Sequence, residues 1–194
     1  MNYLKPIITI VFIYLSIPII VAQKGIQLNE KAPLFEAKDQ LGRMISLEKE
    51  IGKGKVVILF YRGQWCPYCN RYMSALQDSL HLITQKGAKI IAITPEKNEE
   101  INKTIEKTNV SFSVIYDEGH KIMDAYDVTF TMSKTKHILY QTYGININEA
   151  SGNKDLALPV PATFIISKQG IVINRHFNED YKLRMSVKDI LQSL

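Results

Sequence analysis

The sequence predicts an α/β domain in which a central mixed β-sheet is flanked by helices on both faces. Two observations support this prediction. Short continuous apolar runs, typical of strands buried on both faces, alternate along the chain with amphipathic segments of helical period. The last two apolar runs are separated only by the turn sequence "KQG", which suits an antiparallel pair of strands.

The first half of the chain is expected to supply a hairpin, two strands and one helix. The turn sequence "DQLGR" before "MISL" indicates a short β-hairpin at residues 39–47. "KVVILFY" at 55–61 and "AKIIAIT" at 88–94 are β-branched runs expected in the interior of the sheet. The helix between them is expected to end at Gly87 and to carry its apolar side chains on one stripe, namely Met73, Leu76, Leu80 and Ile83.

The second half continues the alternation and includes one long polar segment. Helices are expected at residues 98–109, 118–128 and 186–194, and strands at 112–117, 162–167 and 170–177. Residues 129–158 are longer and more polar than a simple connection requires, so we expect an insertion that covers part of the domain.

The N-terminal segment has the composition of a leader. Lys5 supplies a short positive region, an uncharged apolar run follows, and the small residue Ala22 ends it, which is the arrangement of a secretory signal peptide. We therefore predict a signal peptide at residues 1–22, one domain at residues 23–194, and a periplasmic or other extracytoplasmic location. The alternative is an uncleaved membrane anchor at residues 6–22, because the apolar run approaches the ~17 residues that span a bilayer.

The charged residues do not point to a highly charged partner. The chain has 24 Lys and Arg against 19 Asp and Glu, a formal net charge of +5, and the two signs are interspersed. No basic stripe with interleaved aromatic residues occurs, so we expect no nucleic-acid partner. Membrane contact is expected only if the leader stays attached.

Both cysteines of the chain lie in one short motif, "FYRGQWCPYCNR". Cys66 follows a predicted strand and precedes a predicted helix, whose first position suits Pro67. The positive end of that helix stabilises a thiolate and can lower a thiol pKa from about 8.5 to roughly 3.5–7.5. Cys69, one turn on, can close a disulfide and is expected to be the more buried. Cys66 is the predicted nucleophile, Cys69 the resolving thiol, and Arg62 a source of positive charge over Cys66.

Two other uses of a C-x-x-C pair fit the sequence less well. Zinc needs about four ligands, and the four histidines form no closely spaced pair near the cysteines. A structural bridge across so short a loop constrains the unfolded chain little. We therefore predict a redox pair, and we expect no metal and no other cofactor.

A second marker of the site is "LPVPATFII" at residues 158–166. A proline directly before a buried strand removes a ladder donor and is unusual. Together with the C-x-x-C motif it predicts a cis peptide between Val160 and Pro161 that presents backbone beside the thiols, so Pro161 is counted with the catalytic residues. Trp65, Tyr68 and Val160 are expected to line the substrate surface, with Trp65 partly exposed.

These motifs resemble the alkyl hydroperoxide reductase/thiol-specific antioxidant (AhpC/TSA) superfamily, and within it a peroxiredoxin-like branch. "KAPLFEAKDQLGRMISL", "FYRGQWCPYCN", "AITPE" and "LPVPATFIIS" match its patterns over nearly all of the mature chain. The resemblance implies a thioredoxin-like fold with an N-terminal β extension and an insertion before the strand that follows Pro161. It also implies that a thioredoxin-type protein is the reductant.

The sequence departs from both parent mechanisms. Peroxiredoxins carry Thr or Ser three residues before the reactive Cys and an Arg from the late strand, where this chain has Gly63 and Pro161. Thioredoxins carry a buried Asp six residues before the first Cys, where this chain has Phe60. Glu96 is a candidate replacement for that Asp, although "PEKNEE" is more typical of a solvated helix start.

We therefore predict a thiol-based antioxidant oxidoreductase with two candidate substrates. A peroxide would convert Cys66 to a sulfenic acid that Cys69 condenses to a disulfide, whereas a protein disulfide would give a mixed disulfide that Cys69 resolves. The resemblance favours peroxide, which we take as the leading prediction, and "CPYC" with Pro161 favours disulfide exchange. A non-catalytic binding module with an inert bridge is the alternative from a different class.

Overall fold

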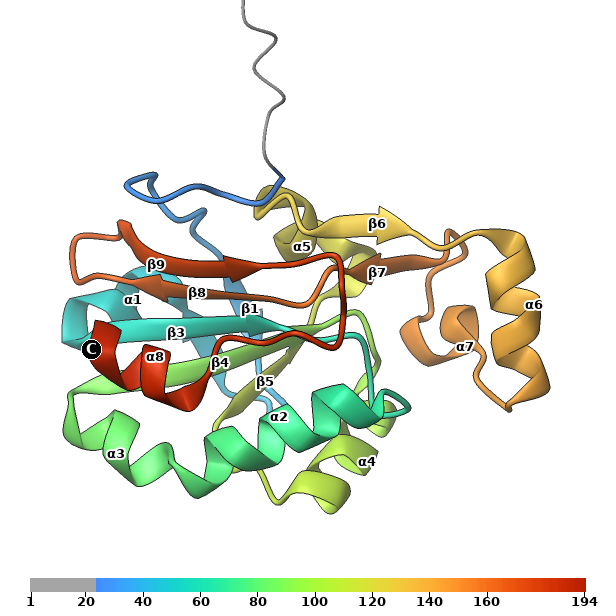
Figure 1. Ribbon diagram of the computed structural model, residues 1–194, viewed down its shortest axis with the longest axis horizontal. Coiled ribbons are helices and arrows are strands. Elements are labelled where there is room, and N and C mark those ends of the chain that lie inside the picture. Colours follow the sequence, from blue (N-terminus) through green and yellow to red (C-terminus); the bar gives the residue numbers. More distant parts are fainter. Residues whose placement is uncertain (1–23) are drawn as a thin grey trace, which may run out of the picture.

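The computed structural model describes residues 24–194 and contains the predicted mixed sheet with helices on both faces (Figure 1). The five strands of this sheet run in the order β5–β4–β3–β8–β9. The parallel strands are β3 (Lys55–Phe60), β4 (Ala88–Thr94) and β5 (Ser113–Tyr116). β8 (Ala162–Ile166) pairs antiparallel with β3 and with β9 (Val172–Phe177). The leader predicted at residues 1–22 lies outside the described residues.

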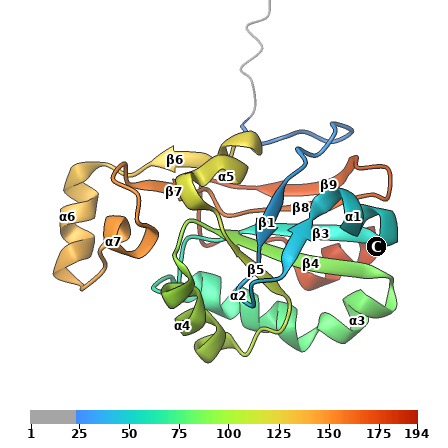
Figure 2. The same ribbon diagram turned by 180° about the vertical axis from the view of Figure 1, so that it is seen from behind.

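The side chains of β3 alternate between two cores, because successive residues of a strand point to opposite faces. Val57 and Leu59 pack against one helical layer, made of α2 (Pro67–Asp78), α3 (Leu80–Gln85), α4 (Asn98–Thr108) and α8 (Val187–Ser193). Ile58 and Phe60 pack on the other face, against α1 (Leu47–Lys53) and α5 (Lys121–Ala125). Both helices lie on the side of the sheet seen in Figure 2, and the 3-10 turn η1 (Glu118–His120) directly precedes α5. No helix among residues 24–194 is both long and apolar enough to cross a membrane.

The predicted N-terminal hairpin is confirmed and covers the edge of the sheet. It consists of β1 (Glu36–Lys38) and β2 (Met44–Ser46), paired antiparallel. The main-chain N–H of Gln40 donates to the carbonyl of Val114 at 2.9 Å, and the Gln40 side chain accepts from the Val114 N–H at 2.7 Å. The hairpin therefore satisfies backbone groups that β5 would otherwise expose.

Two helical features differ from the prediction. The expected helix after β3 is interrupted at Ser79 and continues as α3, ending before Gly87 as predicted. The break follows the sequence Asp-Ser, two residues whose side chains compete with the helical hydrogen bonds. α1 was not predicted, because its apolar pair Leu47 and Ile51, one turn apart, begins inside the segment "MISL" that has the character of a strand.

The insertion predicted at residues 129–158 is a small folded arm. It contains β6 (Thr129–Thr131), α6 (Lys134–Thr142), α7 (Ile147–Ser151) and β7 (Ala157–Pro159), and β6 pairs antiparallel with β7. Its apolar cluster centres on Met132, Ile147 and Leu158, and the ring of Trp65 packs against it. The predicted covering role is confirmed, since the arm lies over the residue next to Cys66.

The predicted cis peptide before Pro161 is wrong: no cis peptide bond occurs among residues 24–194. The N–H of Val160 donates to the carbonyl of Val128 at 2.8 Å, which extends the pairing between the two strands of the arm. The chain then passes from β7 into β8 in an extended course. A trans bond, favoured before proline by about 0.5–1 kcal/mol, suits this course.

Candidate active site

The two cysteines lie where β3 leads into α2. Cys66 is the N-cap residue of α2, Pro67 is its first residue, and Cys69 follows within the first turn. The cysteines form a disulfide with their Cα atoms 5.2 Å apart. The main-chain N–H of Cys69 donates to Sγ of Cys66 at 3.3 Å, so a free donor of the helix start points at this sulfur.

The expected difference in burial between the cysteines is absent. Cys66 and Cys69 are each 1% exposed, so the prediction that Cys69 is the more buried is wrong. Cys66 belongs to the same buried core cluster as Cys69, and the neighbouring Trp65 packs against the arm, with its ring 5.4 Å from that of Tyr140. Trp65 itself is partly exposed, as predicted. The helix start, and not exposure, distinguishes Cys66 from Cys69.

Arg62 is buried among aromatic rings. Its guanidinium lies 4.9 Å from the ring centre of Trp65 and 4.8 Å from that of Tyr181, and it donates to the hydroxyl of Tyr140 at 3.1 Å. Among the described residues its contacts are therefore with rings and a hydroxyl, and no hydrogen bond joins it to the sulfur of Cys66. That Arg62 provides positive charge over Cys66 therefore stays a prediction, while its guanidinium lies against the ring of the neighbouring Trp65.

Arg184 is a residue of the site that the sequence did not indicate. It lies between β9 and α8, and its guanidinium donates to Sγ of Cys69 at 3.6 Å. Burial lowers the pKa of Arg184 to about 10, and the positive charge of Arg62 acts in the same direction. The residue remains charged at neutral pH. It lies 115 positions from Cys69 in an irregular segment, where no periodicity could have placed it.

The side chain of Glu96 packs against Gly63, the position at which peroxiredoxins carry Thr or Ser. Gly63 has a φ of +152°, and a Cβ atom there would lie 2.3 Å from Oε1 of Glu96 and 2.6 Å from Nε1 of Trp65. Any larger residue would displace both side chains or the loop itself. The position therefore cannot hold a hydroxyl group in this arrangement.

The prediction that Glu96 belongs to a solvated helix start is wrong. α4 begins only at Asn98, and Glu96 is 2% exposed beneath the loop that leads to Cys66. One carboxylate oxygen accepts from the N–H of Gln64 at 2.8 Å, whereas Oε1 has no hydrogen-bond partner within residues 24–194. Burial raises the pKa of this carboxyl to about 8. A buried titratable acid thus lies against the C-x-x-C loop, on a different strand end from the thioredoxin Asp.

The remaining predicted site residues surround the same region. The ring of Tyr68 packs edge-on against Tyr181, with the centroids 5.6 Å apart. Val160 and Pro161 are buried and, with Arg62, line a cavity of about 270 Å³. The residues predicted to form the site are therefore brought together at one end of the sheet.

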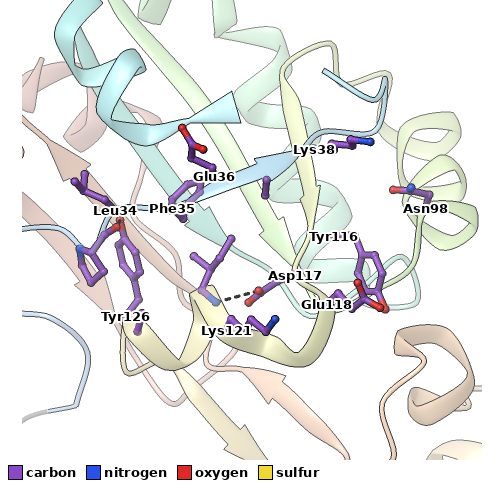
Figure 3. A pocket seen from close by; sticks show the side chains of 14 residues that line it. Leu34, Phe35, Glu36, Lys38, Asn98, Tyr116, Asp117, Glu118, Lys121 and Tyr126 are labelled. Atoms are coloured by element: carbon purple, nitrogen blue, oxygen red, sulfur yellow. Dashed lines mark hydrogen bonds between the residues drawn. The ribbon is translucent and has the colours of Figure 1, made fainter. Parts of the chain in front are cut away.

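A larger cavity of about 570 Å³ lies elsewhere, between β1, the end of β5 and α5 (Figure 3). It contains none of the predicted site residues. Its buried carboxylate, Asp117, accepts from the main-chain N–H groups of Ile122 and Met123 and therefore stabilises the start of α5. Among residues 24–194 no cluster of three His, Cys, Asp or Glu side chains is placed to hold a metal ion.

The chain is similar in sequence to known thiol-dependent proteins. Residues 28–175 match the model of the AhpC/TSA family. The chain belongs to the AhpC/TSA family. It is 28% identical to peroxiredoxin Bcp of Bacillus subtilis, over 87% of this chain and 95% of the relative. It is 26% identical to the thiol-disulfide oxidoreductase ResA of Bacillus cereus, over 82% and 75% of the two chains.

Solved structures of similar proteins share the fold. The crystal structure of peroxidoxin BcpB from Mycobacterium tuberculosis superimposes with a TM-score of 0.66 at 15% identity, covering 86% of this chain and 94% of that one. The predicted thioredoxin-like α/β fold is therefore confirmed. Peroxiredoxins and thiol-disulfide oxidoreductases both occur among the relatives, so family membership supports thiol-dependent oxidoreductase chemistry of either kind.

Removing the charge of Glu96 should change how stability depends on pH. Its pKa is raised from 4.5 to about 8 by burial, so between these values the folded state binds the proton more tightly than the unfolded state. The protonated carboxyl makes its full contribution to the free energy of unfolding below pH 4.5. This contribution falls by roughly 4–5 kcal/mol as the pH rises to 8, at 1.36 kcal/mol per pKa unit. Glu96→Gln should flatten this decline in urea unfolding of the oxidised protein between pH 4.5 and 8.

Glu99→Gln is the matched control, since Glu99 is exposed at the start of α4. It should leave the decline unchanged. A Glu96→Gln curve that runs parallel to the wild-type curve would show that this carboxyl ionises with little penalty in the folded protein.

Removing the guanidinium of Arg184 should slow reduction of the disulfide. A thiol that attacks Cys66 expels Cys69 as a thiolate, and a leaving sulfur stabilised by a positive charge departs faster. Arg184→Met should lower the rate of reduction by dithiothreitol by about three- to tenfold, the effect of ~1 kcal/mol for a partly exposed charged contact. Acid quenching followed by thiol alkylation measures the rate. Lys182→Met, an exposed cation in the same loop, should have no effect, and equal rates in all three proteins would contradict the role of Arg184.

Proposed function

We propose that the chain is a peroxiredoxin-like antioxidant enzyme that reduces peroxides through Cys66, with Cys69 as the resolving thiol. The observation that carries the proposal is the Cys66–Cys69 pair at the start of α2 in a chain of the AhpC/TSA family. The peroxiredoxin relatives support the choice of a peroxide as substrate.

In the proposed cycle the Cys66 thiolate attacks the terminal oxygen of a peroxide. The S–O bond forms, the O–O bond breaks, and an alcohol or water leaves after protonation; Cys66 becomes a sulfenic acid. The Cys69 thiolate then attacks this sulfur, the S–S bond forms, and the hydroxyl group leaves as water. A thioredoxin-type dithiol protein reduces the disulfide by exchange and takes up the oxidising equivalent.

In this cycle the residues around the cysteine pair stabilise the two thiolates and shape the substrate surface. The N–H of Cys69 donates to the sulfur of Cys66 and stabilises its thiolate. Arg184 stabilises the thiolate of Cys69. Arg62 supplies positive charge beside the motif, and Pro161 with Val160, Trp65 and Tyr68 shapes the surface at which the substrate arrives.

Protein-disulfide exchange is the second candidate. It is favoured by the absence of the peroxiredoxin hydroxyl at Gly63, by the buried acid Glu96 beside the loop, and by the relatives named as thiol-disulfide oxidoreductases. In that reaction Cys66 attacks a substrate disulfide, one substrate sulfur leaves as a thiolate, and Cys69 releases the reduced product from the mixed disulfide.

Side-by-side assays of peroxide consumption and protein-disulfide reduction should separate the candidates. Cys66→Ser should abolish both activities, because it removes the nucleophile. Cys69→Ser should consume about one equivalent of peroxide and then stop when thioredoxin is the reductant, because no intramolecular disulfide can form. Peroxide turnover by the wild type no faster than that of a free thiol would refute the peroxidase. Alkylation of Cys66 with the pH dependence of an ordinary free thiol would refute both enzymes and favour the binding module.

We also propose that residues 1–22 form a signal peptide and that residues 23–194 are exported as one domain. The composition of the leader supports this division. The exported protein should begin at Gln23 by intact mass, and Ala22→Arg should block removal of the leader, because the cleavage position requires a small residue. Full-length wild-type protein retained in the membrane fraction would instead identify the uncleaved anchor.

A further inference from the structure

The cavity beside the motif combines three cations with an apolar wall. Its volume is about 270 Å³, and it lies between the arm, the start of β8 and the loop after β9. Its lining residues are Lys24, Arg62, Phe130, Lys136, Val160, Pro161, Glu179 and Tyr181. Arg62 contacts the ring of Trp65, the residue before Cys66, and Tyr181 contacts Tyr68, which lies between the two cysteines. The walls of the cavity therefore touch the active motif on both sides of Cys66.

The charges of this cavity are unbalanced. Three cations face one carboxylate, Glu179, and within residues 24–194 none of the four forms an ion pair. Arg62 is 3% exposed, and its Nε atom has no hydrogen-bond partner in this part of the chain. A buried guanidinium without an anion is costly, because its charge has lost water without gaining a counter-charge. An anionic group in the cavity would supply that counter-charge.

The apolar residues indicate what the anion is attached to. Phe130, Val160, Pro161 and Tyr181 line the same cavity as the cations and give it apolar surface. A ligand that satisfies both parts has a charged head and a carbon chain. A volume of about 270 Å³ lies just below the usual range of small-ligand sites, which suits a carboxylate with several carbon atoms and not a folded partner.

We propose that this cavity binds the carboxylate and adjoining carbon chain of an amphipathic organic acid, and that the substrate of Cys66 is a carboxylate-bearing organic hydroperoxide. The substrate assignment rests on the proposed peroxidase function, whereas the binding of the acid does not. The carboxylate is unchanged in the reaction. Cys66 takes the terminal peroxide oxygen, the O–O bond breaks, and the organic part leaves as a hydroxy acid after taking up a proton.

Binding can be measured without turnover, because Trp65 is the only tryptophan of the chain and lies 4.9 Å from the Arg62 guanidinium. Decanoate, added to the oxidised mature protein below its micelle concentration, should change the Trp65 fluorescence and saturate. Methyl decanoate should bind at least about fivefold more weakly than decanoate. Added salt should weaken the binding of decanoate but not that of the ester, because salt screens the charge of the carboxylate. Equal binding of the acid and its ester would overturn the proposal.

Two lysines of α6 provide a matched pair of variants. Lys136 lines the cavity and Lys134, two residues earlier and also exposed, does not. Lys136→Met should weaken decanoate binding by about two- to fivefold, the effect of an exposed ion pair worth up to ~1 kcal/mol, and Lys134→Met should leave it unchanged. Identical affinities of the two variants would overturn the assigned cavity. The proposal would also be overturned if the protein bound an acidic peptide through Lys136 and did not bind decanoate.

Peroxidase assays then test the substrate assignment. With a carboxylate-bearing hydroperoxide, Lys136→Met should raise KM about two- to fivefold and leave kcat unchanged, and with the methyl ester it should change neither. If the protein binds decanoate but reduces no peroxide, the peroxidase fails and the cavity stands. If it reduces both hydroperoxides with equal KM, the peroxidase stands and the substrate assignment fails.

Discussion

Burial of β3 on both faces is the constraint on which the rest of the molecule depends. A strand with apolar residues at every position needs a layer on each side, so Val57 and Leu59 require the helices α2, α3, α4 and α8, and Ile58 and Phe60 require α1 and α5. Because the chain must leave the end of such a strand and return over the sheet, it delivers Cys66 to the start of α2. The chemistry of the site is a consequence of how the sheet is covered.

At this end of the sheet other charged groups lie near the motif where the family's usual polar residues are absent. The carboxyl of Glu96 occupies the space that a side chain at position 63 would need, and so Gly63 is the residue that this packing permits. Positive charge arrives from Arg62, which is held by rings, and from Arg184, which contacts the sulfur of Cys69. Arg62 belongs to the motif itself, whereas Glu96 and Arg184 reach it from segments far apart in the chain.

Period and spacing were sufficient to predict most of the fold and the centre of the site. The alternation of apolar runs located the strands, and the placement of Cys66 between a strand and a helix start was predicted as the structure has it. Long-range packing was not predictable, because it depends on which irregular segments meet. Arg184 lies in such a segment, the burial of Glu96 depends on α4 beginning two residues later, and the peptide before Pro161 follows the extended course set by β6 and β7.

The arm has a consequence for how this protein could diversify. Its two ends are adjacent, since Thr129 pairs with Pro159, and its small apolar cluster is separate from the two main cores. A segment closed in this way can change in length at little entropic cost to the rest of the chain. Tyr140 of this arm accepts a hydrogen bond from Arg62 of the motif, and Lys136 lines the cavity beside it, so exchanging the arm would change the surroundings of the cysteine pair while the sheet stays intact. The arm can therefore vary in length without disturbing the sheet, and its links to the motif are the contacts of Tyr140 and the packing of Trp65.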